Sequence, residues 1–215
     1  MDPIYIRLSD SSTKLSCGAS RFWGNPDLPA EMSYPMYVDE DGDEYPYQFV
    51  CQINLGDVAP YDLGHLLPES GLLLFFARID RYLGYYDDTG SIGGTISPAD
   101  AVKVVYLPEC NDLVEKVLVD DDGLQISPRE LQICFSTKLP AFEDEHALLA
   151  APTHREWESW DAPYEDCIIL LQVDSFSGDD FSLNFMDCGV LDFLISPSEL
   201  KTRRFDNVRA IVLST

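Results

Sequence analysis

The sequence predicts an α+β fold that is rich in β-strands, with mainly antiparallel sheets, short helices and an internal pseudo-duplication of a strand–strand–helix–strand unit. Apolar runs of strand length outnumber helical patterns, and they do not alternate with long helices as a doubly wound sheet requires. Four landmarks recur in the same order in the two halves of the chain. With 46% hydrophobic and 12% aromatic residues, the 215-residue chain has the composition of a globular protein.

The four landmarks are an apolar run with an internal glutamine, a glycine-led strand, a Ser-Pro-x-acid motif and a β-branched run. In the first half they lie at residues 49–54, 71–76, 97–100 and 102–107. In the second half they lie at residues 169–174, 189–194, 196–199 and 208–213. We therefore expect a single domain over residues 1–215 with pseudo-repeats at about 47–108 and 166–215.

The first strand is expected at residues 4–8, where Ile4, Ile6 and Leu8 alternate with polar residues. Residues 20–48 are rich in Pro, Gly and Tyr and predict an irregular, ordered segment. Glycines and aspartates over 81–95 predict a loop or hairpin tip inserted into the first half. The remaining strands are expected at about 48–54, 71–79, 102–107, 131–135, 167–174, 181–186, 189–195 and 207–213.

Helices are expected to be few and short. In the motif Ser196-Pro197-Ser198-Glu199, Ser can cap, Pro suits the first helical position and Glu completes a capping box, which predicts a helix at about 197–204. Residues 97–100 are a weaker copy of the motif. The runs at 111–118 and 143–151 are further helix candidates.

The charge of the chain is its most unusual compositional property. Thirty-eight acids against fourteen bases give a formal net charge of −24. This field repels nucleic-acid phosphates and anionic membrane surfaces, and it favours capture of a basic partner. The alternative is an acidic bacterial cytosolic protein without a charge-dependent role.

A cytoplasmic location is expected. The start of the chain lacks the basic and apolar regions of a signal peptide, and no run approaches the roughly 18 apolar residues of a membrane span. None of the six cysteines has C-x-x-C spacing, which indicates a reducing compartment; they are Cys17, Cys51, Cys110, Cys134, Cys167 and Cys188.

Several motifs resemble those of the YwqG-like family of bacterial proteins of unknown function. They are S-R-F-W-G-N-P-D-L-P at 20–29, Q-I-N at 52–54, G-x-L-x-F-F at 71–76, the segment from His146 to Pro152, and L-L-Q-V-D at 170–174. Ala150 stands where the family has Gly, and 185–189 reads F-M-D-C-G where the family tends to carry Trp-Gly-Asp and then Gly. The resemblance covers the chain from about residue 18 to its end. It implies a cytoplasmic, β-rich α+β protein with internal duplication, and it carries over no activity and no catalytic residue.

No metal site, cofactor site or catalytic constellation is expected. The acidic run that starts at Asp39 begins like a calcium loop, but Glu44 and Val50 occupy the places of the required Gly and Glu. A solvated turn is the preferred interpretation. His146 and His154 are not at helical spacing for zinc, and there is no G-x-S-x-G nucleophile motif. A Cys–His pair would need a spatial proximity that the sequence does not reveal.

Polar residues at the ends of equivalent strands are the candidate ligand-binding residues. Gln52 and Asn54 end one strand, and Gln172 and Asp174 end its counterpart. One interpretation is that the glutamines bridge neighbouring backbone, because buried polar groups need hydrogen bonds. The other is that the four residues line a cleft between the halves; its lip would consist of Arg21, Trp23 and Asn25.

Three functions are compatible with these observations. The first is a non-enzymatic protein-interaction module, for example an immunity-like protein, whose acidic surface binds a basic protein. The second is a small-ligand binder or hydrolase-type enzyme that uses the cleft between the pseudo-repeats. The third is a structural subunit of a larger assembly.

Overall fold

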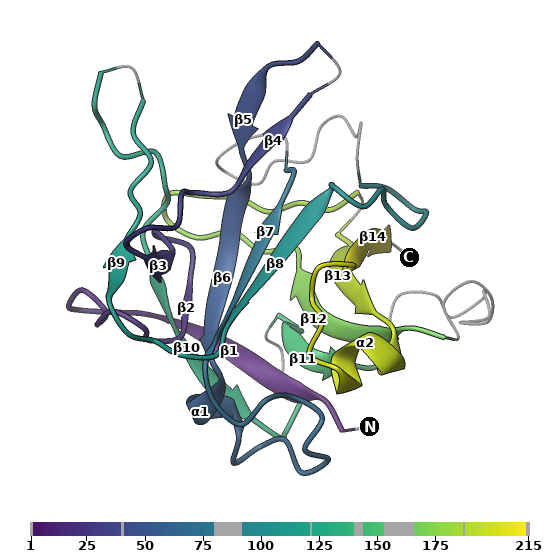
Figure 1. Ribbon diagram of the computed structural model, residues 1–215. Helices are drawn as coiled ribbons and strands as arrows, with labels where there is room; N and C mark the ends of the chain where they lie inside the picture. Colours follow the sequence, from purple (N-terminus) through teal and green to yellow (C-terminus); the bar gives the residue numbers. More distant parts are fainter. Residues whose placement is uncertain are drawn as a thin grey trace.

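One antiparallel sheet of ten strands dominates the computed structural model and nearly closes on itself (Figure 1). The structure describes residues 2–39, 41–79, 92–120, 122–139, 144–152, 166–186 and 188–213. In order across the sheet, the strands are β14 (Arg209–Leu213), β13 (Val190–Ile195), β12 (Ile168–Asp174), β11 (Ala147–Ala150), β1 (Ile4–Asp10), β10 (Leu131–Ser136), β2 (Arg21–Phe22), β6 (Gln48–Asn54), β7 (Leu72–Ala77) and β8 (Val102–Leu107).

Two small sheets and two short helices complete the described elements. One small sheet pairs β3 (Asp27–Pro29) with β9 (Leu113–Glu115), and the other pairs β4 (Met36–Val38) with β5 (Glu44–Pro46). The helices are α1 (Leu55–Val58) and α2 (Pro197–Lys201). Neither is long and apolar enough to span a membrane, and no other helix occurs in the described residues.

The main core lies inside the curved sheet. The side chains of Phe75 on β7 and Phe193 on β13 are fully buried there, with ring centroids 5.2 Å apart. Two smaller clusters cover the outer face, one over β6–β8 and one over β11–β14. Burying a side chain of this size stabilises the fold by roughly 1.5–3 kcal/mol. Because the main core and the two smaller clusters lie on opposite faces, most of the sheet is buried on both faces.

A segment from the first half, residues 93–97, pairs with the end strand β14. The amide of Val212 donates to the carbonyl of Gly93 (2.9 Å), and the amide of Ser97 donates to the carbonyl of Ala210 (2.8 Å). The amide of Ala210 donates in turn to the Ser97 hydroxyl (2.9 Å). The outer edge of β14 is therefore paired although no named strand lies beside it.

The predicted fold class is wrong in its mixed α+β character and in its repeated unit. The structure is β-rich, and α1 follows the first strand of its half whereas α2 follows the second strand of its half. The motif at 97–100 does not start a helix, because the Ser97 hydroxyl accepts from Ala210 on β14. In the second half, by contrast, Ser196 accepts from the amide of Glu199 and caps α2.

Three-stranded meanders are the feature that the two halves do share. In β6–β7–β8, Gln52 pairs with Leu74, and the register shifts between Phe49 and Cys51. In β12–β13–β14, Gln172 pairs with Asp192, and the register shifts between Ile169 and Leu171. Both glutamines thus lie at the same place after an equivalent bulge.

Other element predictions need correction as well. Short apolar runs do not distinguish a helix from a strand: residues 113–115 pair with β3, and residues 147–150 pair with β1 and β12. The strand expected at 181–186 is reduced to isolated bridges. Helix α1 is not among the predicted helices; the side chain of Asn54 caps it by accepting from Gly56 (3.0 Å). Most of the loop expected at 81–95 lies outside the described residues.

Candidate interaction site

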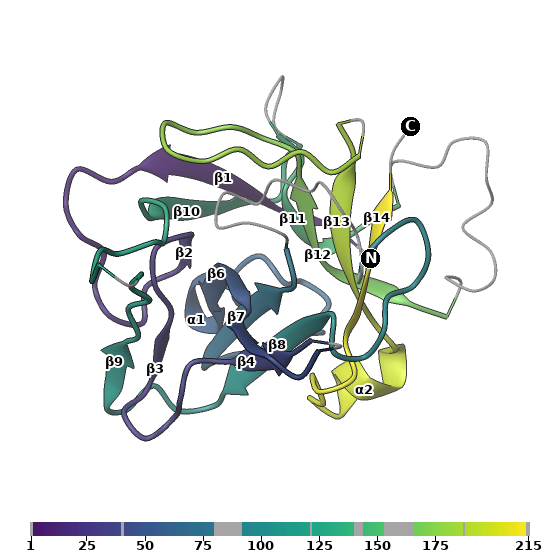
Figure 2. The same cartoon turned by 90° about the horizontal axis from the view of Figure 1, so that it is seen from above.

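Two β-hairpins project from the sheet toward the same end of the molecule, at the top of Figure 1. We call residues 36–46, which contain β4 and β5, the first arm. Residues 113–126, which begin with β9, form the second arm. In Figure 2, β9 lies beside β3, whereas β4 lies nearer to β7 and β8.

The tips of the two arms have the same backbone geometry. In the first arm, the Asp39 carboxylate accepts from the amides of Asp41 and Asp43, both at 2.9 Å. In the second arm, the Asp120 carboxylate accepts from the amides of Asp122 (3.0 Å) and Leu124 (2.8 Å).

A glycine occupies the fourth position of each tip. Gly42 and Gly123 have φ values of +90° and +79°, which only glycine adopts without strain. In each tip the glycine amide also donates to the carbonyl of the aspartate three residues earlier, from Gly42 to Asp39 (3.2 Å) and from Gly123 to Asp120 (3.0 Å), as in a β-turn. The acidic turn residues that the sequence displays twice therefore build two copies of one local structure. Glu40 and Asp121, which complete the acidic runs, lie outside the described residues.

Exposed apolar side chains are concentrated on the arms. Eleven large hydrophobic residues are exposed in the part of the chain that the structure describes, and seven of them lie on the arms. Those seven are Met36, Val38, Tyr45, Val114, Val117, Val119 and Leu124. The pKa of Tyr45 is raised, first by the charge of Asp39 and then by that of Asp43, which shows the negative potential at the first tip. Each arm thus combines apolar flanks with an acidic tip.

Asn25 fixes the root of the second arm. Its side-chain amide donates to Glu115 Oε1 on one leg (2.9 Å), and its side-chain oxygen accepts from the Ser127 hydroxyl on the other leg (2.8 Å). Backbone bonds flank it, from Lys116 to Pro26 and from Gly24 to Pro128. One asparagine therefore holds both legs of the hairpin to the body.

Arg21 forms a buried ion-pair network beneath this root. Its guanidinium donates to Asp27 Oδ2 (2.6 Å) and to Glu130 Oε2 (3.1 Å), and the residue is 1% exposed. Gln52 completes the network: its amide donates to Asp27 Oδ2 (2.7 Å) and its oxygen accepts from the amide of Asp27 (2.9 Å). Such charge-assisted bonds are about twice as strong as neutral ones.

Glu115 connects the network to the protein surface. Burial raises the pKa of this carboxyl, but hydrogen bonds from Lys14 and Asn25 outweigh the effect of burial, and the pKa is lowered overall. Glu115 is therefore ionised at neutral pH and contributes a charged acceptor to the root of the second arm.

The root of the first arm is aromatic. Tyr37 contacts the rings of Tyr45 (5.8 Å) and Tyr47 (5.1 Å), and the Arg78 guanidinium lies 4.4 Å from the centre of the Tyr37 ring. Arg78 also pairs with Asp100 at 3.1 Å. Both arms are therefore anchored by groups that reach back to the main sheet or its loops.

The structure divides the sequence-predicted site residues into two groups. Arg21, Asn25 and Gln52 meet in the network described above. Asn54 lies nearby, where its amide donates to the carbonyl of Gly18 (2.9 Å). The predicted lip residue Trp23 is fully buried, with a φ of +56°, and packs on the rings of Phe22 and Phe181.

Gln172 and Asp174 lie on β12, in the second meander. The Gln172 amide donates to the carbonyl of Glu145 (2.8 Å), and Asp174 Oδ2 accepts from the amide of Glu145 (2.9 Å). The amide of Asp174 donates to His146 Nδ1 (3.0 Å). Phe75 contacts Phe193 between the two meanders, and the hydrogen bonds of the seven candidate residues fall into two separate groups.

His146 is the most strongly perturbed histidine of the described residues. It is 2% exposed and packs against the rings of Phe22 (5.6 Å) and Phe176 (4.6 Å). Burial lowers its pKa to about 3, so the imidazole is neutral at physiological pH. Its Nε2 is buried without a hydrogen-bond partner among the described groups. His154 lies outside the described residues.

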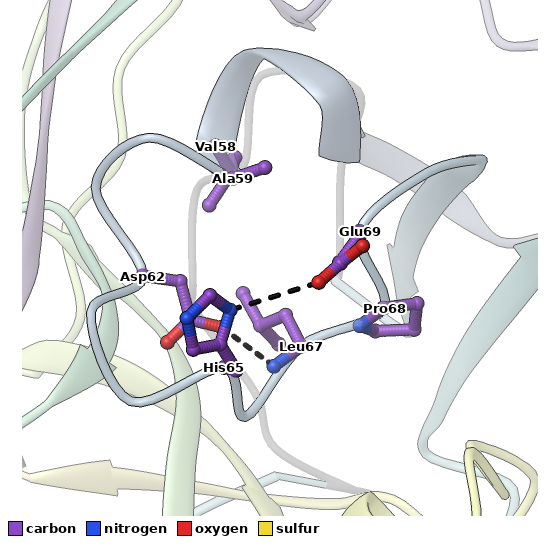
Figure 3. Close-up of a pocket in the computed structure, with 7 residues that line it drawn as sticks. All are labelled: Val58, Ala59, Asp62, His65, Leu67, Pro68 and Glu69. Atoms are coloured by element: carbon purple, nitrogen blue, oxygen red, sulfur yellow. Dashed lines mark hydrogen bonds and ion pairs between the residues drawn. The ribbon is translucent and has the colours of Figure 1, made fainter.

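A hollow of about 200 Å³ lies between α1 and β7 (Figure 3). In Figure 3 the imidazole of His65 faces Glu69, with 3.7 Å between Nδ1 and Oε1, and Asp62 accepts from the amide of Leu67 (2.7 Å). Both partners of the His65–Glu69 pair are about three-quarters exposed. Such an exposed pair is worth less than about 1 kcal/mol, and the lining of the hollow includes no Cys, Ser, Thr or Lys.

Metal-ligand and redox signals are also weak in the described part of the chain. No group of three or more His, Cys, Asp and Glu residues there could hold a metal ion. All six cysteines are free thiols. Burial raises the pKa of Cys51 well above its usual value, and it also raises the pKa of Cys110, so neither thiol is activated.

The sequence does not reveal which residues form hydrogen bonds with Arg21 and Asn25. Asp27, Glu115 and Glu130 do not stand out in the sequence, because two of them are about a hundred residues away along the chain. The buried acid Asp192 is also missed. The one available signal for Asp192 is a lone carboxylate inside the apolar run 190–195.

Comparison with protein families identifies one related family. A family model described as a domain of unknown function, DUF1963, matches residues 20–165 and 143–212. No curated protein matches the chain. The matches cover both arms and both meanders.

Proposed function

The chain belongs to the DUF1963 family, and from this premise we propose that it is a non-enzymatic interaction module whose two arms bind a basic protein. The observation that carries the proposal is the matched pair of arms, each with an acidic tip and exposed apolar flanks.

The chemistry of the arms suits a partner with both cationic and apolar groups. The formal net charge of −24 steers a basic protein toward the module and accelerates its association. The exposed side chains of Val38, Tyr45 and Leu124 then offer apolar area next to the charges. Apolar contact supplies affinity that salt does not screen, which separates a specific complex from simple charge attraction.

The anchored roots support the same function. Asn25 holds both legs of the second arm, and Arg78 stacks on Tyr37 in the first arm. Arms that are held in place before binding lose less conformational entropy on association.

We also propose a narrower family relationship and a cellular location for the protein. The motif at 20–29 and the glutamine strands favour the YwqG-like group of bacterial proteins. The six free thiols and the acidic surface favour the cytoplasm.

The test compares a variant of the tips with a variant that has the same charge change elsewhere. Asp41→Lys with Asp122→Lys reverses one charge on each tip and leaves the turn acceptors Asp39 and Asp120 in place. Glu69→Lys with Asp206→Lys is the control, because both residues are exposed and lie away from the arms. Partners are captured from lysate of the source cell, identified, purified and titrated against each variant.

We expect the tip variant to bind the purified partner about tenfold more weakly or worse, which corresponds to ~1.4 kcal/mol. The control variant should retain the wild-type affinity. A partner whose affinity falls equally in both variants is attracted by net charge alone and would contradict the proposal. Failure to capture any stoichiometric basic protein would also contradict it.

The alternative of a cleft between the pseudo-repeats has less support. The interior between the meanders is filled by contacts such as that of Phe75 with Phe193, and the seven candidate residues are divided between two places.

A further inference from the structure

Asp192 on β13 is buried without a hydrogen-bond partner. It is 0% exposed, and neither carboxylate oxygen has a partner among the residues that the structure describes. Burial raises the pKa of this carboxyl well above its usual value. Unpaired carboxyl groups are costly in an apolar environment, so the position calls for an explanation.

The fold itself does not require an acid at this position. The equivalent place in the first meander, opposite Gln52, is occupied by Leu74, which is fully buried. The two meanders share register and bulge, and a leucine satisfies the first one completely.

Gln52 and Gln172 have different neighbours on the adjacent strands. Across the first meander the row runs Arg21–Gln52–Leu74, and Arg21 supplies a buried cation. Across the second meander it runs Ala147–Gln172–Asp192. Where the first row has its own guanidinium, the second row has a methyl group.

A hollow of about 130 Å³ adjoins the second row. Its lining includes Ala147, Gln172, Glu145 and Tyr5, so every polar side chain among these four can accept a hydrogen bond. Asp192 stands one strand beyond Gln172 on the same face, which is about 4.8 Å in a sheet.

We propose that this hollow together with Asp192 is a binding site for a small organic cation with N–H donors, a guanidinium or a primary ammonium compound. Glu145 and Asp192 are the carboxylates that the cation would meet, from the open side and from the buried side. Gln172 lines the hollow and pairs with Asp192 on the neighbouring strand, so the cation would reach Asp192 by displacing the Gln172 side chain. The cation takes the role that Arg21 has in the first meander, where one guanidinium bonds two carboxylates.

The polar groups around the hollow favour a cation over an anion or an apolar molecule. The lining offers a carboxylate, an amide and a hydroxyl, and the residue beyond it is a second carboxyl group. An anion would meet two acids, and an apolar molecule would leave Asp192 unpaired. This inference does not rest on the arms, which lie on other elements.

The experiment titrates the full chain with methylguanidinium and, separately, with propylammonium, and follows the backbone amide signals of Ala147 and Gln172 by NMR. Tetramethylammonium, which has no N–H donor, and potassium chloride at equal ionic strength are the ligand controls. The test variants are Asp192→Leu, which reproduces the leucine of the first meander, and the isosteric Asp192→Asn. Glu69→Gln is the control variant, because it removes an exposed carboxylate elsewhere.

We expect saturable shifts in the wild type and in Glu69→Gln, and at least tenfold weaker binding in both Asp192 variants. Two variants are used so that a folding defect in one leaves the other informative. The proposal is overturned if the wild type shows no saturable shift up to 50 mM of either probe, a concentration about fifty times a 1 mM Kd. Equal binding by the Asp192 variants, or by tetramethylammonium, would overturn it as well.

Discussion

The meanders β6–β7–β8 and β12–β13–β14 share one backbone and differ in how they use it. In the first, Gln52 bonds the backbone and side chain of Asp27, and Arg21 neutralises that carboxylate. In the second, Gln172 bonds the carbonyl of Glu145 and lies opposite the unpaired Asp192. Register and bulge fix where a polar group is buried, while its neighbours decide whether the group finds a hydrogen-bond partner.

The largest effect should come from removing the cation of the first meander. Arg21→Met leaves Asp27 and Glu130 without their guanidinium, and we expect a loss of ~3–5 kcal/mol in the free energy of unfolding. Chemical denaturation measures it. Arg129→Met is the matched control: Arg129 pairs with Asp10 and Asp179 but is half exposed, so its loss should cost less than about 1 kcal/mol. Equal losses would show that the first network is no stronger than a surface pair.

A smaller effect of opposite sign is expected in the second meander. Asp192→Leu should raise the free energy of unfolding by ~1–3 kcal/mol at neutral pH, because it removes an unpaired buried carboxyl. The folded-state pKa of Asp192 is raised above 3.8, so the wild type loses stability relative to the variant as the pH rises from about 4. Thermal unfolding between pH 4 and pH 7 measures the difference. The comparison fails if the reciprocal change Leu74→Asp is also stabilising.

The third effect concerns acid sensitivity at His146, which accepts a hydrogen bond from the amide of Asp174 in the second meander. His146 has a pKa of about 3 in the folded state against 6.5 as its ordinary value, so the unfolded chain binds the proton first. Stability should fall as the pH drops below 6.5, by ~2 kcal/mol at pH 5. His146→Phe should lose this dependence while His65→Phe, at an exposed site, should keep it. An unchanged pH profile in His146→Phe would assign acid sensitivity to other groups.

The smallest effect is local to the second arm. Asn25→Ala removes both side-chain bonds that join the legs of the hairpin, and we expect a cost of ~1–2 kcal/mol. Hydrogen exchange should accelerate at the amides of Lys116 and Ile126 in the second arm. The amide of Asp43 in the first arm serves as the internal reference. Faster exchange in both arms would mean that Asn25 acts on the whole fold.

The strands of the meanders could be predicted from the sequence because most of them bury a continuous apolar run. The runs at 48–54, 102–107, 168–174 and 209–213 are strands as expected. Residues 113–115 and 147–150 read as helix candidates in the sequence, because a short apolar run fits either period and its pairing partner is distant. The absence of a helix at 97–100 depends on a hydrogen bond to Ala210, more than a hundred residues away.

The sequence predicts the residue types of the candidate site but not how these residues come together. The turn chemistry at Asp39 and Asp120 and the importance of Arg21 and Asn25 follow from local residue types. That Asn25 links Glu115 to Ser127, and that Arg21 reaches Glu130, depends on tertiary contacts across about a hundred residues. Sequence reasoning also treats the two halves as equivalent, and therefore does not weigh Asp192 against Leu74.

The segment that pairs with β14 has a consequence for self-association. An open edge strand offers unpaired amides and carbonyls to other molecules and is a template for aggregation. The bonds of Gly93 and Ser97 occupy that edge with backbone from the same chain. Because this cover is made of a few hydrogen bonds and not a full strand, its detachment would expose β14 and allow two copies to join their sheets edge to edge.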